Sequence, residues 1–227
     1  MGFYRGPNIV TDGLIFAIDA GSERSYPGSG TTATNLISSN TGTLTNGVGF
    51  GSGNGGHWEF DGVDDGIKFI SELDLSSYSS VTYSGWIKGL GVSTLDRWLS
   101  GTSGATAFHY PDLAISASGL LHYYFTGLTS GWTNTGISIS GTEYNHVVFT
   151  FTNSGGVELY VNGSSMYTAS LNSTTFPSAS NIMIGNRYDL NGEALLGDIA
   201  AVRIYNRALT ASEVLQNYNA QKSRFGL

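Results

Sequence analysis

The stretch 157–164, VELYVNGS, carries two signals that decide the fold class. Apolar residues alternate with Glu158 and Tyr160 along its first half, which is the period of a strand with one buried face. Asn162-Gly163 then supplies the two residue types that best tolerate positive φ, as a two-residue type I′ turn requires. The stretch therefore predicts a β-hairpin.

Similar patterns recur along the chain. Residues 81–88 alternate with a period of two, and residues 14–18 form a near-continuous apolar run that suits a strand buried on both faces. Further β-branched and aromatic runs cover residues 146–151, 182–184 and 199–205. The 32 glycines cluster between these runs, which indicates many turns.

Turn residues mark several connections more specifically. A second Asn-Gly pair, Asn46-Gly47, follows residues 43–45 and predicts a second hairpin. Asp61-Gly62 and Asp65-Gly66 predict tight turns.

One helix is predicted, near the C-terminus. The sequence 210–213, TASE, is a capping box ahead of the apolar residues Val214, Leu215 and Tyr218, so we expect a helix to about residue 221. Many short strands and one late helix favour an all-β, two-sheet antiparallel sandwich with a short C-terminal helix. We divide the chain into an N-terminal arm, residues 1–12, and one sandwich domain, residues 13–227.

Composition excludes several functions. Charged residues make up 12% of the chain, about half the usual share, whereas hydrophobic residues make up 40%, which favours a folded domain with a polar, uncharged surface. The net charge of −7 disfavours nucleic-acid binding, and no apolar run approaches the ~20 residues that span a bilayer. Cysteine is absent, which excludes thiolate catalysis. Residues 1–10 have no apolar core, so we expect no signal peptide.

Four motifs resemble those of laminin-G-like domains of the concanavalin A-like lectin and glucanase superfamily. They are WEFDGVDD at 58–65, VTYSGWIK at 81–88, ELYVNG at 158–163 and GDIAAVRIYNRAL at 197–209. The resemblance covers roughly residues 13–220 and implies a jelly-roll sandwich.

A narrower resemblance involves the two ends of the chain. Residues 12–21 and 25–32, together with RFGL at 224–227, are similar to segments of bacteriophage virion proteins, especially of large marine phages. This resemblance implies a non-enzymatic structural protein on the virion exterior, as capsid decoration or as a tail fibre component. Its partners would be other virion proteins and further copies of itself, and it would be made in the host cytoplasm.

Catalytic residues are not expected. Glycosidases on this fold use carboxylates in the pattern E-x-D-x-x-E, and the nearest match, residues 72–77 (ELDLSS), lacks the third carboxylate and is interpreted as a loop. No nucleophile elbow or zinc-binding spacing accompanies the four histidines. His122 and His146 lie in strand patterns, so we interpret both as structural. We predict no enzymatic activity and no cofactor.

A metal site is the alternative that the family resemblance raises. Many relatives bind calcium near the Asp-Gly turn, where Asp61, Asp64 and Asp65 offer oxygen ligands. The late aspartate of the family falls on Ala200 here, and Asp198 lies two residues earlier. We favour the interpretation that the three aspartates stabilise turns and predict no metal.

Aromatic residues provide the candidate binding site. Tyr123, Tyr124 and Trp132 lie in and after one strand-like run among Ser, Thr and Asn, as in a platform that stacks on sugar rings or contacts a protein. Neighbours on a strand point to opposite faces, so at least one of Tyr123 and Tyr124 must face the core. The alternative function is therefore a lectin-like adhesin module that binds host-surface glycans.

Overall fold

A computed structural model of the chain describes residues 7–93, 95–102, 109–125, 131–171, 176, 180–190 and 192–227, apart from the side chains of residues 71, 72, 109, 110 and 180. The strands are β1 (Leu14–Asp19), β2 (Thr32–Thr34), β3 (Thr41–Thr45), β4 (Gly49–Gly51), β5 (His57–Asp61), β6 (Gly66–Leu73), β7 (Ser80–Gly91), β8 (Asp96–Thr102), β9 (His109–Ile115), β10 (Leu120–Tyr124), β11 (Thr133–Ser138), β12 (Asn145–Thr152), β13 (Gly156–Val161), β14 (Ser164–Ala169), β15 (Ser180–Ile184) and β16 (Leu195–Tyr205). The helices are η1 (Gly53–Gly55), α1 (Ala211–Gln221) and η2 (Lys222–Phe225).

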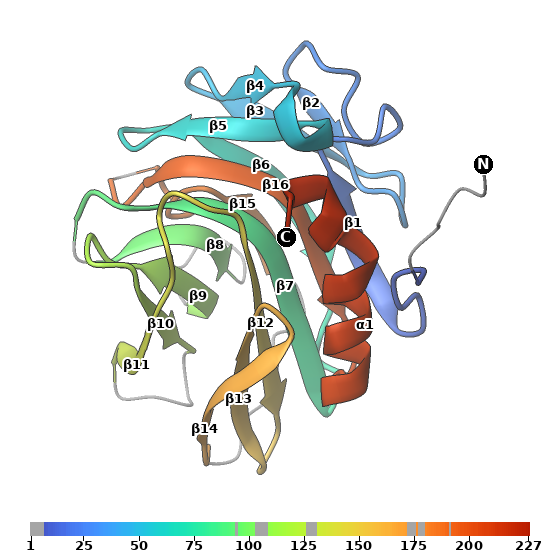
Figure 1. The fold of residues 1–227 in the computed structure, drawn as a ribbon, viewed down its shortest axis with the longest axis vertical. Coiled ribbons are helices and arrows are strands. Elements are labelled where there is room, and N and C mark those ends of the chain that lie inside the picture. The colour runs from blue at the N-terminus through green and yellow to red at the C-terminus, as the bar shows by residue number, and fades with distance from the viewer. Residues whose placement is uncertain are drawn as a thin grey trace.

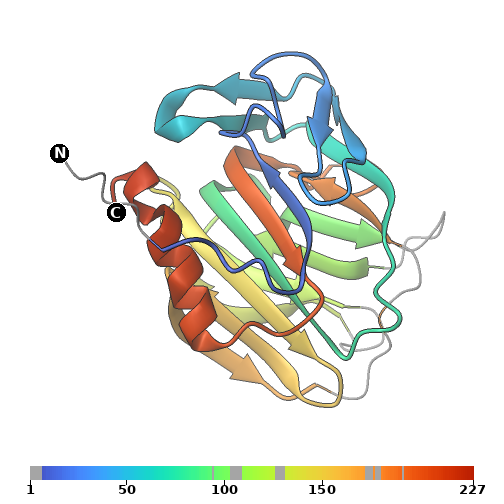
Figure 2. The same ribbon diagram turned by 90° about the vertical axis from the view of Figure 1, so that its right-hand side faces the viewer.

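The strands form two sheets that pack face to face (Figure 1). Sheet A has the order β14-β13-β12-β7-β16-β5-β4, with β1 paired to β16. Sheet B has the order β11-β10-β9-β8-β15-β6-β3-β2. Neighbouring strands in the described part of the chain are antiparallel, and α1 lies against sheet A (Figure 2). The predicted two-sheet antiparallel sandwich with a C-terminal helix is confirmed.

The core between the sheets is rich in aromatic rings. Phe151 of β12 lies 6.0 Å from Tyr83 of β7 and 5.2 Å from Phe125, measured between ring centroids. Trp98 of sheet B is fully buried against Gly85 of sheet A, where a Cβ would lie 2.7 Å from the Trp98 ring. Only glycine lets the two sheets approach so closely at this point.

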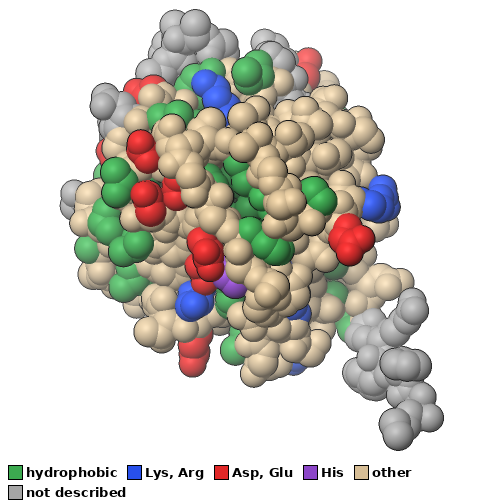
Figure 3. Space-filling view, turned by 90° about the horizontal axis from the view of Figure 1, so that it is seen from above, with side chains coloured by type: hydrophobic (Ala, Val, Ile, Leu, Met, Phe, Trp, Pro, Cys, Tyr) green, Lys and Arg blue, Asp and Glu red, His purple; other side chains and the backbone are tan. Residues whose placement is uncertain are grey.

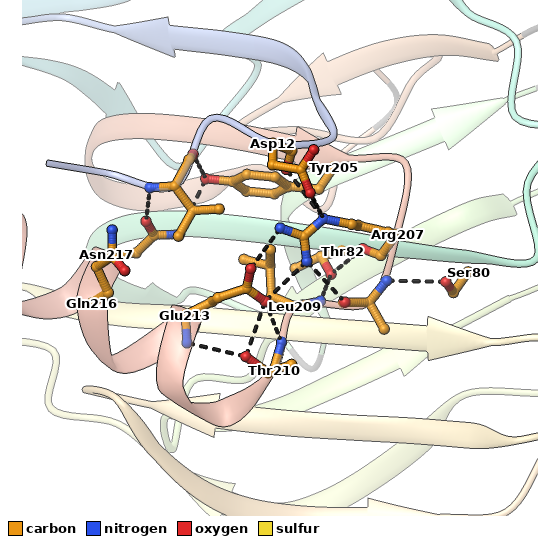
Figure 4. A network of polar contacts seen from close by, with 12 residues as sticks. Asp12, Ser80, Thr82, Tyr205, Arg207, Leu209, Thr210, Glu213, Gln216 and Asn217 are labelled. Atoms are coloured by element: carbon orange, nitrogen blue, oxygen red, sulfur yellow. Dashed lines mark hydrogen bonds and ion pairs between the residues drawn. The ribbon is translucent and has the colours of Figure 1, made fainter.

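Helix α1 begins at the predicted capping box. The Thr210 hydroxyl accepts a hydrogen bond from the Glu213 amide (3.3 Å), and the Glu213 carboxylate accepts one from the Thr210 amide (2.9 Å). Arg207 binds the same carboxylate at 2.6 Å and Asp12 at 2.9 Å (Figure 4). The Arg207 guanidinium lowers the pKa of Glu213 to about 2. The cap is therefore also the point where the helix is tied to the N-terminal arm.

The described part of the arm docks on the protein's own helix. The Val10 amide donates to the Asn217 side chain (2.7 Å), and the Tyr205 hydroxyl donates to the Val10 carbonyl (3.1 Å) (Figure 4). Val10 is 8% exposed and packs with Val214 of α1. Val10 thus extends the core on the helix side of sheet A. No helix in the described ranges is long and apolar enough to cross a membrane.

One Asn-Gly prediction is confirmed and the other is wrong. Asn162 and Gly163 have φ values of 51° and 81° and join β13 to β14 as a hairpin. Asn46 and Gly47 also have positive φ, but they connect β3 of sheet B to β4 of sheet A, so no hairpin forms there. An Asn-Gly turn fixes the local backbone, whereas pairing depends on distant strands: β3 pairs with β2 and β6.

The predicted loop at residues 72–77 also needs correction. Strand β6 continues through Leu73 and pairs with β15, so the first two residues of this segment belong to the sheet. Asp74 follows the strand, and its carboxylate accepts hydrogen bonds from the Ser76 amide (3.0 Å) and hydroxyl (2.7 Å). Ile67 and Phe69 face the core in the first half of β6. Polar residues then interrupt this apolar alternation near the end of the strand, so the sequence pattern did not predict that the strand continues there.

Candidate functional site

Tyr124 and Trp132 form a pair of rings on the outer face of sheet B. Tyr123 of β10 pairs with Thr133 of β11, so Tyr124 and Trp132 lie at the next position across the same two strands. Their ring centroids are 5.9 Å apart with an interplanar angle of 43°, and both side chains are half-buried. The structure thus brings together two of the three aromatic residues that the sequence singled out.

Tyr123 takes the opposite direction. It is 1% exposed and lies between the sheets, 6.0 Å from the ring of Phe149. Burial raises the pKa of its hydroxyl. The prediction that one of the two adjacent tyrosines faces the core is confirmed, and Tyr123 must be removed from the candidate contact residues because alternation along β10 buries it.

Arg97 of β8 supports the ring pair from the sheet. Its guanidinium lies 5.0 Å from the centre of the Trp132 ring, which is within the range of a cation–π contact. The Arg97 Nε donates to Asp112 Oδ2 at 2.6 Å, and the two side chains are 3% and 0% exposed. Arg97 also pairs with Glu193, whose carbonyl accepts from the Arg97 amide (2.9 Å). Buried ion pairs of this kind fix the direction of the guanidinium.

A third aromatic residue, Tyr188, lies further along the same face. The Lys68 Nζ lies 4.3 Å from the centre of the Tyr188 ring, and the Tyr188 hydroxyl accepts from the Asn181 side chain at 3.2 Å. Arg187 bridges Glu193 (3.0 Å) and Asp189 (2.6 Å) beside it. Rings, amides and charged groups therefore alternate across the outer face of sheet B, in the combination that orients polar ligands.

His122 adds a polar group next to Tyr124. It pairs with Asn134 across the strands and points to the same face as Tyr124, two residues along. Burial lowers the pKa of His122, so the ring is neutral at pH 7 and has one donor and one acceptor nitrogen. Neutral imidazole and amide groups are suitable partners for hydroxyl groups.

His146, the other histidine that the sequence indicated to be structural, cannot be reached by a ligand. His146 is 1% exposed beneath α1, where its Nε2 lies 2.9 Å from the Ser84 hydroxyl. Burial, followed by the charge of Arg203, lowers the pKa of His146 to about 3. Its ring stacks on Trp86 at 5.0 Å. The structural role predicted for His146 is confirmed. His109, in contrast, has a side chain outside the described part of the structure.

Asp61, Asp64 and Asp65 come together, with one oxygen from each within 4.8 Å of the others. Asp61 Oδ1 accepts from the Val63 amide (2.8 Å) and Asp65 Oδ2 from the Asp61 amide (3.0 Å), which is the predicted turn role. Asp65 Oδ1 is buried with no donor among the described residues, and burial raises the Asp65 pKa. These three carboxylates could hold part of the oxygen shell of calcium.

Asp198 does not extend this cluster. Its carboxylate instead lies 3.1 Å from Lys88 and 3.9 Å from His57, on the outer face of sheet A. Ala200, at the position of the family's late aspartate, is fully buried. The sequence did not reveal the grouping of Asp198 with His57, nor that of Arg97 with Asp112 and Glu193. No short motif links these residues, because the contacts join strands that are distant in the chain.

The comparisons agree with this fold. The model of the concanavalin A-like lectin/glucanases superfamily matches residues 61–215, more than half of the chain. The chain therefore belongs to this superfamily. No curated protein sequence matches it.

Solved structures with a similar fold include enzymes and binding domains. Trypanosoma rangeli sialidase in complex with sialic acid is 17% identical, with a TM-score of 0.73 over 96% of this chain and 35% of that one. Domain 4 of an extracellular arabinanase from Geobacillus stearothermophilus, in complex with arabinotriose, is 18% identical, with a TM-score of 0.67 over 90% and 98%. The binding domain of Paraclostridial Mosquitocidal Protein 1 is 16% identical, with a TM-score of 0.68 over 92% and 52%. The chain thus spans about a third of the sialidase.

Proposed function

We propose that this domain binds carbohydrate on the outer face of sheet B, by stacking a sugar ring on Trp132 and Tyr124. The observation that carries the proposal is the half-buried ring pair held over the buried Arg97. Stacking needs rigid, partly exposed aromatic surface with hydrogen-bonding groups around it. His122 and Asn134 supply such groups on the neighbouring positions.

The comparisons favour this class of ligand. The arabinanase domain was solved with arabinotriose and is covered almost completely by this chain, as a separate domain. A whole domain of similar size and fold that holds an oligosaccharide is a closer parallel than an enzyme of which this chain spans a third. Arabino-oligosaccharides are therefore the first probes to test.

The experiment is a glycan array that includes arabino-oligosaccharides and sialylated glycans, followed by calorimetric titration of the best ligand. Trp132→Ala should weaken binding by about fivefold or more, because stacking on a ring contributes on the order of 1 kcal/mol or more. Leu215→Ala, on the exposed side of α1, is the matched control and should bind as the wild type does. Binding that survives Trp132→Ala unchanged would refute the assignment of this face.

We propose further that the domain acts by binding and has no hydrolytic activity. The carboxylate of Asp74, in the incomplete glycosidase pattern, accepts hydrogen bonds from the Ser76 amide and hydroxyl. The carboxylate of Asp198 is paired with Lys88. A reducing-sugar assay on the polysaccharide that the array identifies should show no turnover above that of buffer. Turnover that disappears in Asp198→Asn would overturn this part of the proposal.

A second candidate function, compatible with the first, is display on the exterior of a bacteriophage particle. It is supported by the similarity of residues 12–21, 25–32 and 224–227 to virion proteins and by the low fraction of charged residues. The domain would decorate a capsid or form part of a tail fibre, as a homo-oligomer with other virion proteins. Mass spectrometry of purified particles should detect it at high copy number, and its absence there would eliminate this candidate.

A further inference from the structure

The connection between β15 and β16 has an unusual backbone conformation. Two of its residues, Leu190 and Glu193, have positive φ values of 57° and 63°. All other described non-glycine residues with positive φ are asparagine or serine. A leucine or glutamate rarely adopts this conformation, and it persists only where the surrounding contacts hold it in place. The contacts of Glu193 therefore need an explanation.

Two arginines hold Glu193 through both its backbone and its side chain. The Glu193 carbonyl accepts a hydrogen bond from the Arg97 amide at 2.9 Å. Its carboxylate Oε2 accepts from Nη1 of Arg97 and from Nη1 of Arg187, the latter at 3.0 Å. The Arg97 side chain is 3% exposed, whereas that of Glu193 is 31% exposed. The carboxylate is thus fixed between two guanidinium groups while part of it faces solvent.

This carboxylate is close to the proposed stacking surface. Only the Arg97 guanidinium lies between Glu193 and Trp132, and that guanidinium is 5.0 Å from the centre of the Trp132 ring. Charges interact over a Debye length of about 10 Å at 0.1 M salt. A sugar stacked on Trp132 would therefore experience the negative charge of Glu193.

The two guanidinium groups are already compensated by other carboxylates. Arg97 Nε donates to Asp112 at 2.6 Å. Arg187 donates from Nε and Nη2 to the two carboxylate oxygens of Asp189, at 2.6 and 2.7 Å, which is a bidentate pair. Each arginine thus has one aspartate of its own, and Glu193 is a third carboxylate for two positive charges. The network has a net charge of −1.

Other titratable groups on this face do not cancel that charge. Lys68 lies on β6, which β15 separates from β8, and its Nζ lies over the Tyr188 ring at 4.3 Å. Burial lowers the pKa of His122, so its ring is neutral at pH 7. Charged residues are also sparse, at 12% of the chain, as Figure 3 illustrates for one end of the molecule. Glu193 therefore sets the sign of the local charge beside Trp132.

We propose that Glu193 determines the specificity of the sugar site and makes it selective for uncharged sugars over acidic ones. This inference rests on the proposed binding of sugar at Trp132 and Tyr124. A sugar carboxylate at that position would be repelled by Glu193, and the charges of Arg97 and Arg187 are already paired. A neutral sugar meets no such repulsion.

The test uses calorimetric titration of the full chain at pH 7 with two neutral probes, arabinotriose and galactotriose, and one acidic probe, trigalacturonic acid. The last two differ in the oxidation of C6. Wild type should bind the neutral probes more tightly than the acidic one. Glu193→Gln removes the charge and retains the size of the side chain, so this preference should fall by about threefold, as expected for one screened charge.

Two control variants separate the local charge from other effects. Glu193→Asp keeps the negative charge and should retain the preference for neutral probes. Glu158→Gln removes the same charge from β13 of sheet A, so it changes the net charge of the chain without changing the site. Its preference should equal that of wild type, and a change as large as that in Glu193→Gln would overturn the assignment to Glu193.

Salt provides a second readout, which a purely structural role of Glu193 would not affect. Raising the salt concentration from about 0.01 M to about 1 M shortens the Debye length from about 30 to about 3 Å. The preference of wild type should therefore decrease with salt, and that of Glu193→Gln should change less. Equal salt dependence in the two proteins would contradict the inference.

The Trp132→Ala variant distinguishes the two proposals. If it abolishes binding of the neutral probes while wild type and Glu193→Gln show the same preference, the sugar site remains and the role of Glu193 is wrong. Tighter binding of trigalacturonic acid than of galactotriose by wild type would have the same meaning. Neutral-probe binding that is absent in wild type, or that Trp132→Ala leaves unchanged, would overturn both proposals.

Discussion

The two sheets each carry a tryptophan on their outer face, and the two residues have different environments. Trp86 on sheet A is fully buried, because Phe225, His146 and Tyr218 stack around it at 4.3, 5.0 and 5.8 Å. Trp132 on sheet B is half-buried and lies over Arg97 at 5.0 Å.

The covering elements explain this difference. Helix α1 and the C-terminal residues after it cover part of the outer face of sheet A, around Trp86 and Tyr205, with a second apolar layer. The outer face of sheet B instead carries a buried ion pair, between Arg97 and Asp112, beneath its aromatic residues. One face therefore contributes to stability through burial, whereas the other presents ordered polar and aromatic groups. This division is why we place ligand binding on sheet B.

The largest expected effect is on stability, from replacing the buried Trp86 of sheet A rather than the half-buried Trp132 of sheet B. Trp86→Ala should lower the free energy of unfolding by about 3–5 kcal/mol, because it opens a cavity beneath the helix. Trp132→Ala should lower it by less than half as much. Urea denaturation of both variants measures the difference. Equal losses would mean that sheet B is covered as completely as sheet A.

Asp112→Ala tests the ion pair on the other face. Removing one partner of a buried pair leaves the Arg97 charge partly uncompensated, so we expect a loss of about 3 kcal/mol. Asp189→Ala removes a partner of Arg187 from a pair with 51% exposure on the aspartate side, and it should change stability by less than ~1 kcal/mol. If both variants behave alike, the Arg97 pair is not desolvated in solution.

The pH dependence of stability should reflect the burial of His146 beneath α1 on sheet A. His146 has a pKa of about 3 in the folded state, well below the value of about 6.5 in an unfolded chain. Protons therefore bind preferentially to the unfolded state as the pH falls below 6.5, and at pH 5 this one group should reduce stability by about 2 kcal/mol relative to pH 7. His146→Gln should remove that part of the pH dependence in denaturation experiments at the two pH values. An unaltered slope would show that His146 is accessible to water.

The smallest effect concerns the start of the covering helix. Thr210→Ala removes the side-chain cap of α1 and should reduce stability by about 1 kcal/mol. Ser212→Ala, in the exposed first turn of the same helix, should be close to neutral. Thermal denaturation of the pair distinguishes the cap from general effects of polar surface loss, and a larger loss in Ser212→Ala would contradict the capping assignment.

Much of the fold could be predicted because its signals are local. The alternation in residues 81–88 and 157–161, the Asn162-Gly163 turn and the capping box at Thr210 all act within a few residues of the chain. The candidate site was predictable only in part. The sequence identified Tyr124 and Trp132, because both lie beside strand-like runs, but alternation alone could not decide whether Tyr123 or Tyr124 faces outward.

The sequence by itself determined many of the strands, most of the predicted turns, the late helix and the absence of thiol chemistry, because each of these depends on residue type and spacing within a short stretch of chain. Only the tertiary structure decided which strands pair, as the Asn46-Gly47 connection between the sheets shows. It also decided that Arg97 meets Asp112, Glu193 and Trp132, and that His57 meets Glu59 and Asp198. These groupings depend on sheet order and register, which are set by packing of the whole core.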